Sequence, residues 1–535
     1  MNNNDIIDGN NNYNDTQNLD SITKTKMENN YINEILFFYV WRNKFLLSEI
    51  QRHHRLYRKN DCIVIIKSMD ELRYHPHRRY ATEIIIDVDE PLEPHGQVIP
   101  YGTTNLKFGK FNQPIQACDI PTTVTILEFK WNYSHRFDIK SVVPPSVTHL
   151  RTGRNQDVSP NSLPPSLTRL TMSLDQDITI ETLPKSLKYL LLSQFNRTIV
   201  PGSFGSVVDL GLDFFNQPLK AGDLPQTCQN IVLFKFNQPL LPNILPPELK
   251  SLELHRFEHP LSDGVLPKSI TDLHLDEFNH PLSNSLSKLH SLEDLYLSSF
   301  NQEISIETFP SSINTLVLCS FNKVLKPNVL PSSIINLILN SYNHPLEPQV
   351  LPPNVKHLEL KSYNRNLGKH LFPNTLQHLF ISNYSKELLE NDLPSSIIGL
   401  YFESKISYLF NPIRFQTNSI PPSVKKLELP INHSQPLKVG FLPNSVEQIE
   451  IPNLYAHPLQ VGAIPNSVTH VKLPEIFIPL RVGVLPESLT RLTFSYGFNQ
   501  PLDPAIIPKS VTQIALPYTY RHPIPDILSH LIKRF

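Results

Sequence analysis

The sequence predicts a mainly β solenoid of about 20 repeats of 21–22 residues, each contributing one short parallel strand, with short helical caps at the ends. Three observations support this fold class. A Leu-Pro dipeptide or a close variant returns every 20 to 23 residues over most of the chain between Pro100 and Pro508. The residue six positions after each such anchor is apolar in every repeat, and the residue eight positions after it is apolar in all but one. Self-similarity at a fixed period is typical of stacked repeat units.

The spacing also predicts the geometry of one repeat. Positions six and eight differ by two, so their side chains lie on the same side of a strand. A repeat of about 21 residues has no room for a strand and a long helix, and its prolines favour extended return segments. One such unit cannot bury its leucines alone, so we expect each repeat to stack on its neighbours.

Two sequence features carry a resemblance to known families. The Leu-x-x-Leu-x-Leu run followed by Asn resembles a leucine-rich repeat, and the Leu-Pro opening and the length are closest to the short bacterial type of that repeat. The run Phe-Asn-Gln-Pro-Leu, which starts at Phe111, Phe215, Phe236 and Phe498, resembles the FNIP repeat, named for Phe-Asn-Ile-Pro. The match covers roughly residues 93 to 517. It implies a leucine-rich-repeat-like solenoid and few functional assignments.

Composition narrows the class of protein. The chain has 49 prolines, 16 glycines and a formal net charge of −1, so no global field draws it to nucleic acid or to an anionic membrane. Its four cysteines lie far apart and form neither a disulfide framework nor a zinc motif. No secretory signal is visible, and the longest apolar run, residues 35–41, is too short to span a bilayer. We therefore expect a monomeric protein of the cytoplasm or of nucleus and cytoplasm.

We predict five segments along the chain. Residues 1–30 form a disordered Asn-rich tail, in which self-association is the alternative to a solvated tail. Residues 31–60 form an amphipathic helical segment, and residues 61–97 an N-terminal cap with a worn first repeat. Residues 98–517 form the repeat solenoid, and residues 518–535 a C-terminal cap helix.

The segment 31–60 has two interpretations. Its apolar residues approximate helical spacing, so it could cover the exposed leucine face of the first repeat. It could instead be a docking element, similar to a degenerate F-box, that binds ubiquitin-ligase machinery. The basic and histidine-rich residues that follow, from Arg52 to Arg79, are read as a solvated face rather than a nucleic-acid site.

A candidate binding surface comes from the residue seven positions after the anchor, which faces away from the core between the two buried leucines. In five of six successive strands it is apolar or aromatic, and in leucine-rich repeats that sheet lines the concave side. A contiguous apolar patch usually marks an interface, although β-propensity explains the same residues. One 27-residue interval follows, whose extra residues form either a binding loop or a tolerated bulge. The predicted partner-binding residues are Tyr296, Val317, Ile338, Phe380, Tyr401, Tyr408 and Phe410.

Other recurring residues are read as structural. Asn residues just past each strand are expected to bond to backbone groups of adjoining turns, with a second ladder of the preceding Phe or Tyr. His259, His280 and His344 share one repeat slot, but no carboxylate column accompanies them as a metal site would require. No catalytic motif, cofactor site or metal site is found, and an enzyme is not expected. The predicted function is a protein-interaction scaffold of unknown partner; the alternative is a substrate receptor of a ubiquitin ligase.

Overall fold

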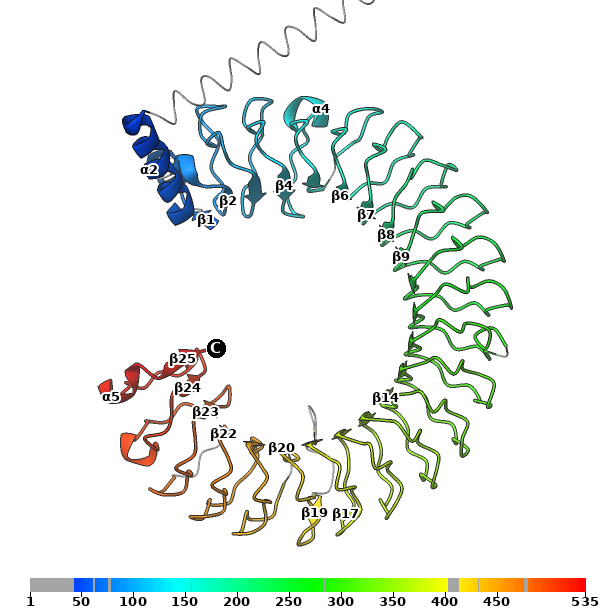
Figure 1. Ribbon diagram of the computed structural model, residues 1–535, viewed down its shortest axis with the longest axis vertical. Coiled ribbons are helices and arrows are strands. Elements are labelled where there is room, and N and C mark those ends of the chain that lie inside the picture. The colour runs from blue at the N-terminus through cyan, green and yellow to red at the C-terminus, as the bar shows by residue number, and fades with distance from the viewer. Residues whose placement is uncertain are drawn as a thin grey trace, which may run out of the picture. The chain divides into compact units, whose positions relative to one another are not determined.

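The structure is a computed structural model that describes residues 43–60, 63–75, 78–154, 156–282, 284–402, 413–431, 433–475 and 480–535 (Figure 1). Two compact units are found: Met1–Val158 with Ser162–Leu167, and Ser159–Asn161 with Thr168–Phe535. The predictions for the Asn-rich tail, for the first part of the segment 31–60 and for Tyr408 and Phe410 lie outside the described residues.

The first unit begins with helices and continues as short parallel strands. Each of its strands pairs in parallel with the next, from β1 to β5. The worn first repeat expected before residue 98 is β2, and a further strand, β1, precedes it. The elements are α2 (Lys44–Asn60), β1 (Ile63–Ile66), α3 (Met69–Tyr74), η1 (Arg78–Tyr80), β2 (Glu83–Ile86), β3 (Asn105–Phe108), β4 (Ile126–Phe129), α4 (Ile139–Val142) and β5 (His149–Arg151).

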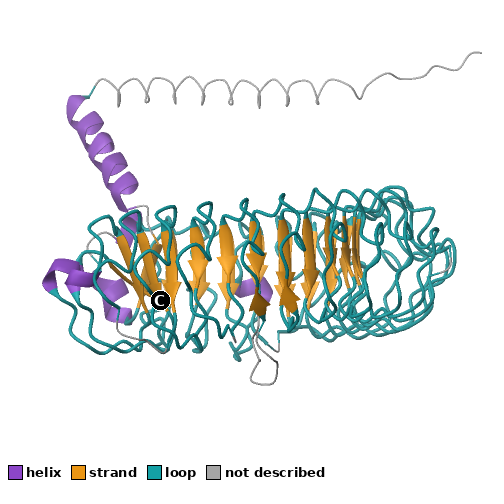
Figure 2. Ribbon diagram, turned by 90° about the horizontal axis from the view of Figure 1, so that it is seen from below, coloured by secondary structure: helices purple, strands orange, loops and turns teal. Residues whose placement is uncertain are grey.

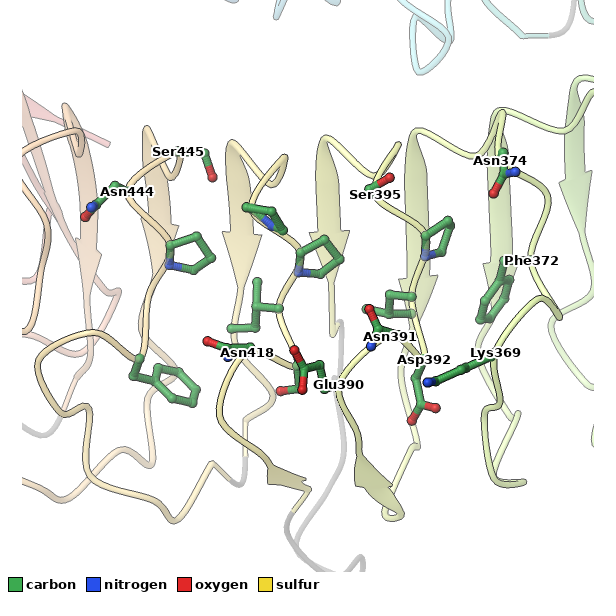
Figure 3. Close-up of a pocket in the computed structure, with 18 of the residues that line it drawn as sticks. Lys369, Phe372, Asn374, Glu390, Asn391, Asp392, Ser395, Asn418, Asn444 and Ser445 are labelled. Carbon is green, nitrogen blue, oxygen red and sulfur yellow. The ribbon is translucent and has the colours of Figure 1, made fainter.

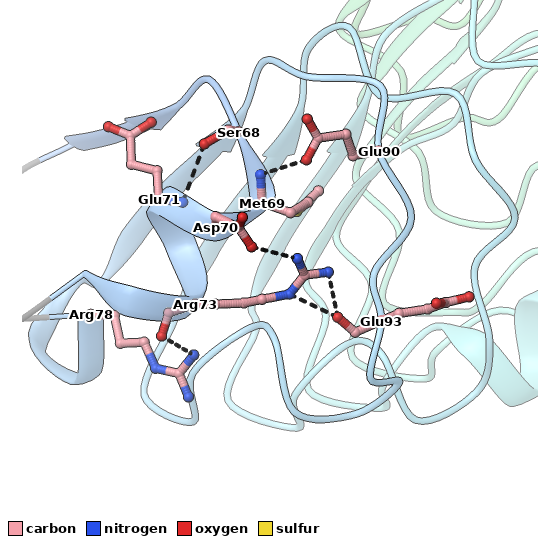
Figure 4. A network of polar contacts seen from close by, with 8 residues as sticks. All are labelled: Ser68, Met69, Asp70, Glu71, Arg73, Arg78, Glu90 and Glu93. Carbon is pink, nitrogen blue, oxygen red and sulfur yellow. Dashed lines mark hydrogen bonds and ion pairs between the residues drawn. The ribbon is translucent and has the colours of Figure 1, made fainter.

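A network of polar contacts stabilises the short helix α3, which follows β1 (Figure 4). The hydroxyl of Ser68 caps the helix by accepting from the backbone N–H of Glu71 at 3.3 Å. Arg73 in the last turn donates to Asp70 at 2.9 Å and, through Nε, to the carbonyl oxygen of Glu93 at 2.8 Å. These bonds tie α3 to the loop that follows β2.

The second unit is a succession of parallel strands, in which each main strand from β6 onward pairs with the next. Its main strands are β6 (Arg169–Met172), β7 (Tyr189–Leu192), β8 (Asp209–Leu212), β9 (Asn230–Val232), β10 (Ser251–Glu253), β11 (Asp272–His274), β12 (Asp294–Tyr296), β13 (Thr315–Val317), β14 (Asn336–Ile338), β15 (His357–Leu360), β16 (His378–Ile381), β18 (Gly399–Tyr401), β20 (Lys426–Glu428), β21 (Gln448–Glu450), β22 (His470–Leu473), β23 (Arg491–Phe494), β24 (Gln513–Leu516) and β25 (Ile532–Arg534). Within this unit the strands lie on the inner side of the curve and the loops on the outer side (Figures 1 and 2). The predicted β solenoid with parallel strands is confirmed.

The repeat pattern is explained by a turn at each anchor. The N–H of the residue three positions after the anchor donates to the anchor's carbonyl oxygen, as from Leu187 to Pro184 at 3.1 Å and from Val468 to Pro465 at 3.0 Å. This bond closes a β-turn and turns the third side chain into the core, where Leu187 is 1% exposed. The residue three positions after the anchor is therefore apolar because the β-turn directs its side chain into the core.

Between strand and turn, two ladders run from repeat to repeat. The side-chain oxygen of Asn279 accepts from the backbone N–H of Asn301, and that of Asn301 accepts from Asn322, at 2.8 and 2.9 Å. Inside the coil, Phe300 stacks on Phe321 with ring centroids 6.4 Å apart and planes within 8°. Both predicted ladders are thus present, although the Asn side chains lie at the surface rather than buried. They satisfy loop N–H groups that have no helix to pair with.

The C-terminal end differs in detail from the helix predicted over residues 518–535. The helix α5 (Asp526–Ser529) spans four residues, and only its Leu528 is buried. Ile532 belongs to β25, which pairs in parallel with β24, so the sheet itself continues to the end of the chain. A short 3-10 helix, η2 (Pro504–Ile506), precedes β24. No helix in the described part of the chain is long and apolar enough to cross a membrane.

Candidate functional site

The side of the second unit's sheet that faces away from the core carries one continuous row of side chains. We call Tyr296, Val317, Ile338, Glu359, Phe380 and Tyr401 the central row; each is the register partner of the next on adjoining parallel strands. The structure therefore brings together the five described residues of the predicted binding surface. Val317 is only 6% exposed and the others are half-buried, so each of these other side chains presents only part of its surface to solvent.

Aromatic stacking organises both ends of the central row. The ring of Tyr296 stacks on His274 with centroids 3.9 Å apart, and Phe380 stacks on Tyr401 at 4.3 Å. Gly399 leaves the space that Tyr401 occupies, because a Cβ at this position would lie 2.5 Å from the phenolic oxygen. These contacts hold flat ring faces in fixed orientations, which lowers the conformational entropy lost when a partner binds.

The charges on this face are distributed unevenly along the unit. The strands β8 to β12 contribute the carboxylates of Asp209, Glu253, Asp272 and Asp294, and these strands contain no Lys or Arg. Beyond Tyr401, a shallow hollow of about 190 Å³ is lined by both signs, including Lys426, Glu450, Lys472 and Arg491. The central row thus lies between an acidic region and a mixed, partly basic region.

Near neutral pH the two tyrosines of the central row and the neighbouring His378 are uncharged, whereas Glu359 of the row forms an ion pair with Lys361 at 3.2 Å. Partial burial, and then the negative charges of Asp294 and Asp272, raise the pKa of the Tyr296 phenol. Burial and the charge of Glu428 raise the pKa of Tyr401. Burial, followed by the nearby His357 and Lys426, lowers the pKa of His378. The phenols stay protonated and this imidazole stays neutral, as suits an apolar contact surface.

A second candidate region is a hollow of about 1000 Å³ at the loops of four successive repeats (Figure 3). It is lined by the turns around residues 369–374, 390–395, 418–422 and 440–445. Burial raises the pKa of Asp392, whose carboxylate accepts from the N–H of Leu389 at 2.8 Å. The hydroxyl of Ser419 is buried and has no hydrogen-bond partner among the described residues. The hollow is open and its polar lining is scattered, which does not define a chemical site.

The 27-residue interval lies beside this hollow. Part of it forms a small second sheet, in which β17 (Glu387–Leu388) pairs in parallel with β19 (Arg414–Phe415). The side-chain amide of Gln435 both donates to and accepts from the backbone of Phe415, at 3.2 and 2.7 Å, and so covers the free edge. Phe415 itself is 5% exposed. This aromatic residue of the interval is therefore core, and the role predicted for Tyr408 and Phe410 stays a prediction.

The histidine column has a structural explanation. His259, His280 and His344 each donate from Nε2 to a backbone carbonyl of the preceding repeat, at 3.2, 2.6 and 3.0 Å. Gln302 uses its side-chain amide in the same way at 3.1 Å. Across the described ranges no group of three or more His, Cys, Asp or Glu could hold a metal ion. The column is a set of inter-repeat donors.

Two features escaped the sequence analysis. The residue three positions before the anchor adopts a left-handed backbone, as in Gly222 (φ 91°) and Asn391 (φ 66°). The residue two before the anchor is often Asp, Ser or Thr, and it accepts a loop N–H; Asp223 does so from Lys220 at 2.7 Å. The sequence does carry a signal for both features. Gly or Asn, followed by a short polar residue, recurs before Leu-Pro.

Comparison with known proteins identifies the family. The FNIP repeat model matches residues 111–154, 154–195, 215–257, 257–293, 300–342, 342–384, 410–454, 432–476, 455–497 and 478–519. The chain belongs to the FNIP repeat family. No curated protein sequence matches the chain.

Solved structures place this FNIP repeat protein among leucine-rich-repeat solenoids. CroV588, described as a novel circular LRR protein, is 27% identical over 85% of this chain and 72% of its own, with a TM-score of 0.64. YopM from Yersinia enterocolitica WA-314 is 18% identical over 83% of this chain and 92% of its own, with a TM-score of 0.39. The functional domain of InlJ from Listeria monocytogenes is 14% identical over 69% and 74%, with a TM-score of 0.38. The latter two are too dissimilar to support an inference.

The sequence resemblance is therefore confirmed, and with it the fold. A solenoid of this type is generally a protein-interaction fold, because its stacked strands present an extended surface.

Proposed function

We propose that this FNIP repeat protein is a non-catalytic interaction scaffold that binds a protein partner on the strand face of its second unit. The observation that carries this proposal is the central row itself. Apolar or aromatic side chains occupy five of six adjoining strands on the face turned away from the core, within roughly 25 Å. Elsewhere on the same face these positions are mostly polar, for example Glu253, Glu450 and Lys472. Contiguous apolar surface of this kind marks interfaces.

The test uses the double variant Ile338→Lys, Phe380→Lys. Both side chains are half-buried on the sheet face, so lysine can extend to solvent while its charge opposes apolar contact. The matched control is Val324→Lys, Val439→Lys, which replaces apolar loop residues that are 60% and 66% exposed. Quantitative affinity capture from native lysate should lose specific partners with the first variant alone, at unchanged circular dichroism. An identical partner set for both variants contradicts the proposal.

The alternative function, a substrate receptor of a ubiquitin ligase, is favoured by one observation on α2. Its apolar residues Phe45, Leu46 and Ile50 are 72%, 40% and 46% exposed. Its contact with the rest of the unit includes a hydrogen bond between His53 Nδ1 and the Tyr80 hydroxyl at 2.6 Å. A helix whose apolar residues remain exposed fits a docking element better than a cap.

Replacing Phe45 and Leu46 by serine tests this alternative. Because both side chains are exposed, the unfolding transition should not move, while a ligase component that co-purifies with the wild type should be lost. The matched control is Ser48→Ala on the same exposed helix, which leaves the apolar residues in place. If no ligase component co-purifies with the wild type, the ligase function is ruled out.

We also propose that the protein is a monomer of the cytoplasm or of nucleus and cytoplasm, with no nucleic-acid partner. The near-zero formal net charge of −1 supports the last point. Imaging of a fluorescent fusion and light scattering of the purified chain test compartment and mass; a membrane-bound or dimeric protein contradicts the proposal.

A further inference from the structure

The acidic part of the strand face adjoins the apolar central row directly. Asp272 and Asp294 are register partners on β11 and β12, and β12 also carries Tyr296, the first residue of the row. The next apolar residues, Val317 and Ile338, follow on β13 and β14. Asp294 and Tyr296 are two residues apart on the same strand, about 6.6 Å, so carboxylates and apolar groups occupy neighbouring rows of one sheet face.

The fold does not neutralise these carboxylates. Asp272 accepts from the hydroxyl of its neighbour Thr271 at 2.6 Å, and Asp209 accepts from the amide of Asn230 at 2.5 Å. Glu253 lies 3.5 Å from the imidazole of His255. In the part of the chain that the structure describes, no ion pair with Lys or Arg is formed by any of the four carboxylates of these strands, which are Asp209, Glu253, Asp272 and Asp294. Like charges directly opposite each other on neighbouring strands destabilise a sheet, so their arrangement is not explained by stability.

The other end of the same face is different. There Lys472 on β22 forms an ion pair with Glu450 on β21, its register partner. Lys425 likewise bonds to Glu447 at 2.8 Å beside the same strands. Glu450 on β21 therefore has a cation on the next strand, whereas the carboxylates on β8, β10, β11 and β12 have no ion pair with Lys or Arg among the described residues.

We infer that the strand face of the second unit binds a protein segment in which arginine or lysine side chains alternate with, or flank, apolar ones. The cations of the segment lie against Asp272, Asp294 and their neighbours, and its apolar side chains lie against the half-buried Tyr296 and Ile338. This inference rests on the proposed function, since it specifies the chemistry of the partner for the same face. Complementary charge next to an apolar contact gives both orientation and a fast encounter.

The test measures binding of three labelled peptides of equal length to the full chain by fluorescence anisotropy. In the first peptide arginine alternates with leucine, in the second glutamate alternates with leucine, and in the third arginine alternates with serine. The arginine–leucine peptide should bind most tightly, and raising the salt concentration should weaken it, because exposed charges are screened within about 10 Å at 0.1 M salt. Equal affinity for the glutamate–leucine peptide overturns the inference.

Two variants locate the site. Asp272→Lys, Asp294→Lys should weaken the arginine–leucine peptide at least about tenfold. Glu307→Lys, Glu347→Lys changes the net charge equally at two exposed loop carboxylates and should leave the affinity nearly unchanged. Equal losses for both variants would mean that net charge alone acts, and would overturn the inference.

The outcomes separate this inference from the proposed function. If Ile338→Lys, Phe380→Lys abolishes peptide binding while Asp272→Lys, Asp294→Lys does not, the face binds but the charge assignment is wrong. If neither variant changes the binding of any peptide, the face itself is not the site and both proposals fail. Unfolding transitions that match the wild type are required of every variant.

Discussion

Two regions of the second unit fill the inside of the coil with rings in different ways. They are the run from Phe278 to Tyr342 and the stretch from Ile413 to Tyr455. In the first, consecutive rings stack with planes within 8° and centroids 6.3 to 6.5 Å apart. In the second, His433 takes a place among the buried rings and meets Phe415 edge-on at 5.4 Å and Tyr455 at 6.0 Å. This second stretch begins inside the 27-residue interval, which ends at Pro421.

The difference extends to the polar groups. In the regular run, the hydroxyl of Thr308 accepts from the N–H of Ser305 at 2.8 Å. At the equivalent place within the 27-residue interval, the N–H of Gln416 instead donates to the carbonyl of Leu388 at 3.0 Å, across the small sheet of β17 and β19. The buried hydroxyl of Ser419 is left without a partner among the described residues. The change of repeat length thus removes the hydrogen bond that pairs this hydroxyl with a loop N–H in a regular repeat.

The largest expected effect comes from breaking the regular ladder. Phe300→Ala removes a fully buried ring that stacks on both neighbours, and it should destabilise the second unit by about 3–5 kcal/mol. Denaturant unfolding monitored by circular dichroism measures this loss. Phe300→Leu, which keeps most of the volume, should cost clearly less; equal costs would mean that the ladder position does not depend on packing.

Acid should affect the irregular stretch selectively. Burial lowers the pKa of His433 to about 4, with a weak opposing contact from the Gln435 backbone and a further lowering by the charge of His457. The stability that depends on neutral His433 is complete above about pH 6.5, its ordinary value, and is lost as pH falls toward 4. The loss reaches about 3 kcal/mol there, since each pKa unit corresponds to about 1.4 kcal/mol.

His433→Phe restores the residue type of the regular ladder and is the matched test. Unfolding midpoints of wild type and variant, compared at pH 7 and pH 4.5, should diverge on acidification, with the variant losing less. The same acid-dependent loss in both proteins would show that another group is responsible.

A smaller effect is expected from the Asn ladder. Asn322→Ala removes the oxygen that accepts from the N–H of Asn343 at 3.0 Å and should cost about 1 kcal/mol. Asn322→Asp keeps an acceptor in the same place and should cost less. If alanine and aspartate variants unfold at the same denaturant concentration, the bond does not contribute to stability.

The smallest expected effect distinguishes the paired hydroxyl of the regular run from the unpaired hydroxyl of the irregular stretch. Thr308→Ala removes a satisfied buried acceptor and should cost about 1 kcal/mol, whereas Ser419→Ala removes an unpaired one and should lie within about 0.5 kcal/mol of the wild type. The measurement is the difference between the two free energies of unfolding. A larger cost at Ser419 would mean that its hydroxyl has a partner.

Much of the fold could be predicted from the sequence because each repeat carries its own geometry. The Leu-x-Leu spacing of Leu273 and Leu275 places both in the core, and Phe-Asn pairs such as Phe300 and Asn301 form the two ladders. The expected helix near Ile532 was replaced by strand β25, because the last open sheet edge pairs more favourably than a four-residue helix extends.

The sequence predicted which face of the sheet the candidate site occupies, but it did not predict how the side chains of that site pack against one another. Side-chain alternation placed Ile338 and Phe380 on the face away from the core, as the structure shows. The depth of Val317, the stacking of His274 on Tyr296 and the space above Gly399 depend on neighbouring strands. His274 and Tyr296 are one repeat apart, and the space at Gly399 depends both on Tyr401 of the same strand and on His378 of the preceding repeat. Repeat periodicity alone does not specify such packing.

The central claim is that the regular coil leaves its strand face free to hold a partner. The most direct measurement places a photo-crosslinking amino acid at Glu359, in the middle of the central row, and at Val324 in a loop as a control. The account predicts crosslinked partner adducts from position 359 at physiological salt, and few or none from position 324. Adducts from the loop position with none from position 359 would contradict it.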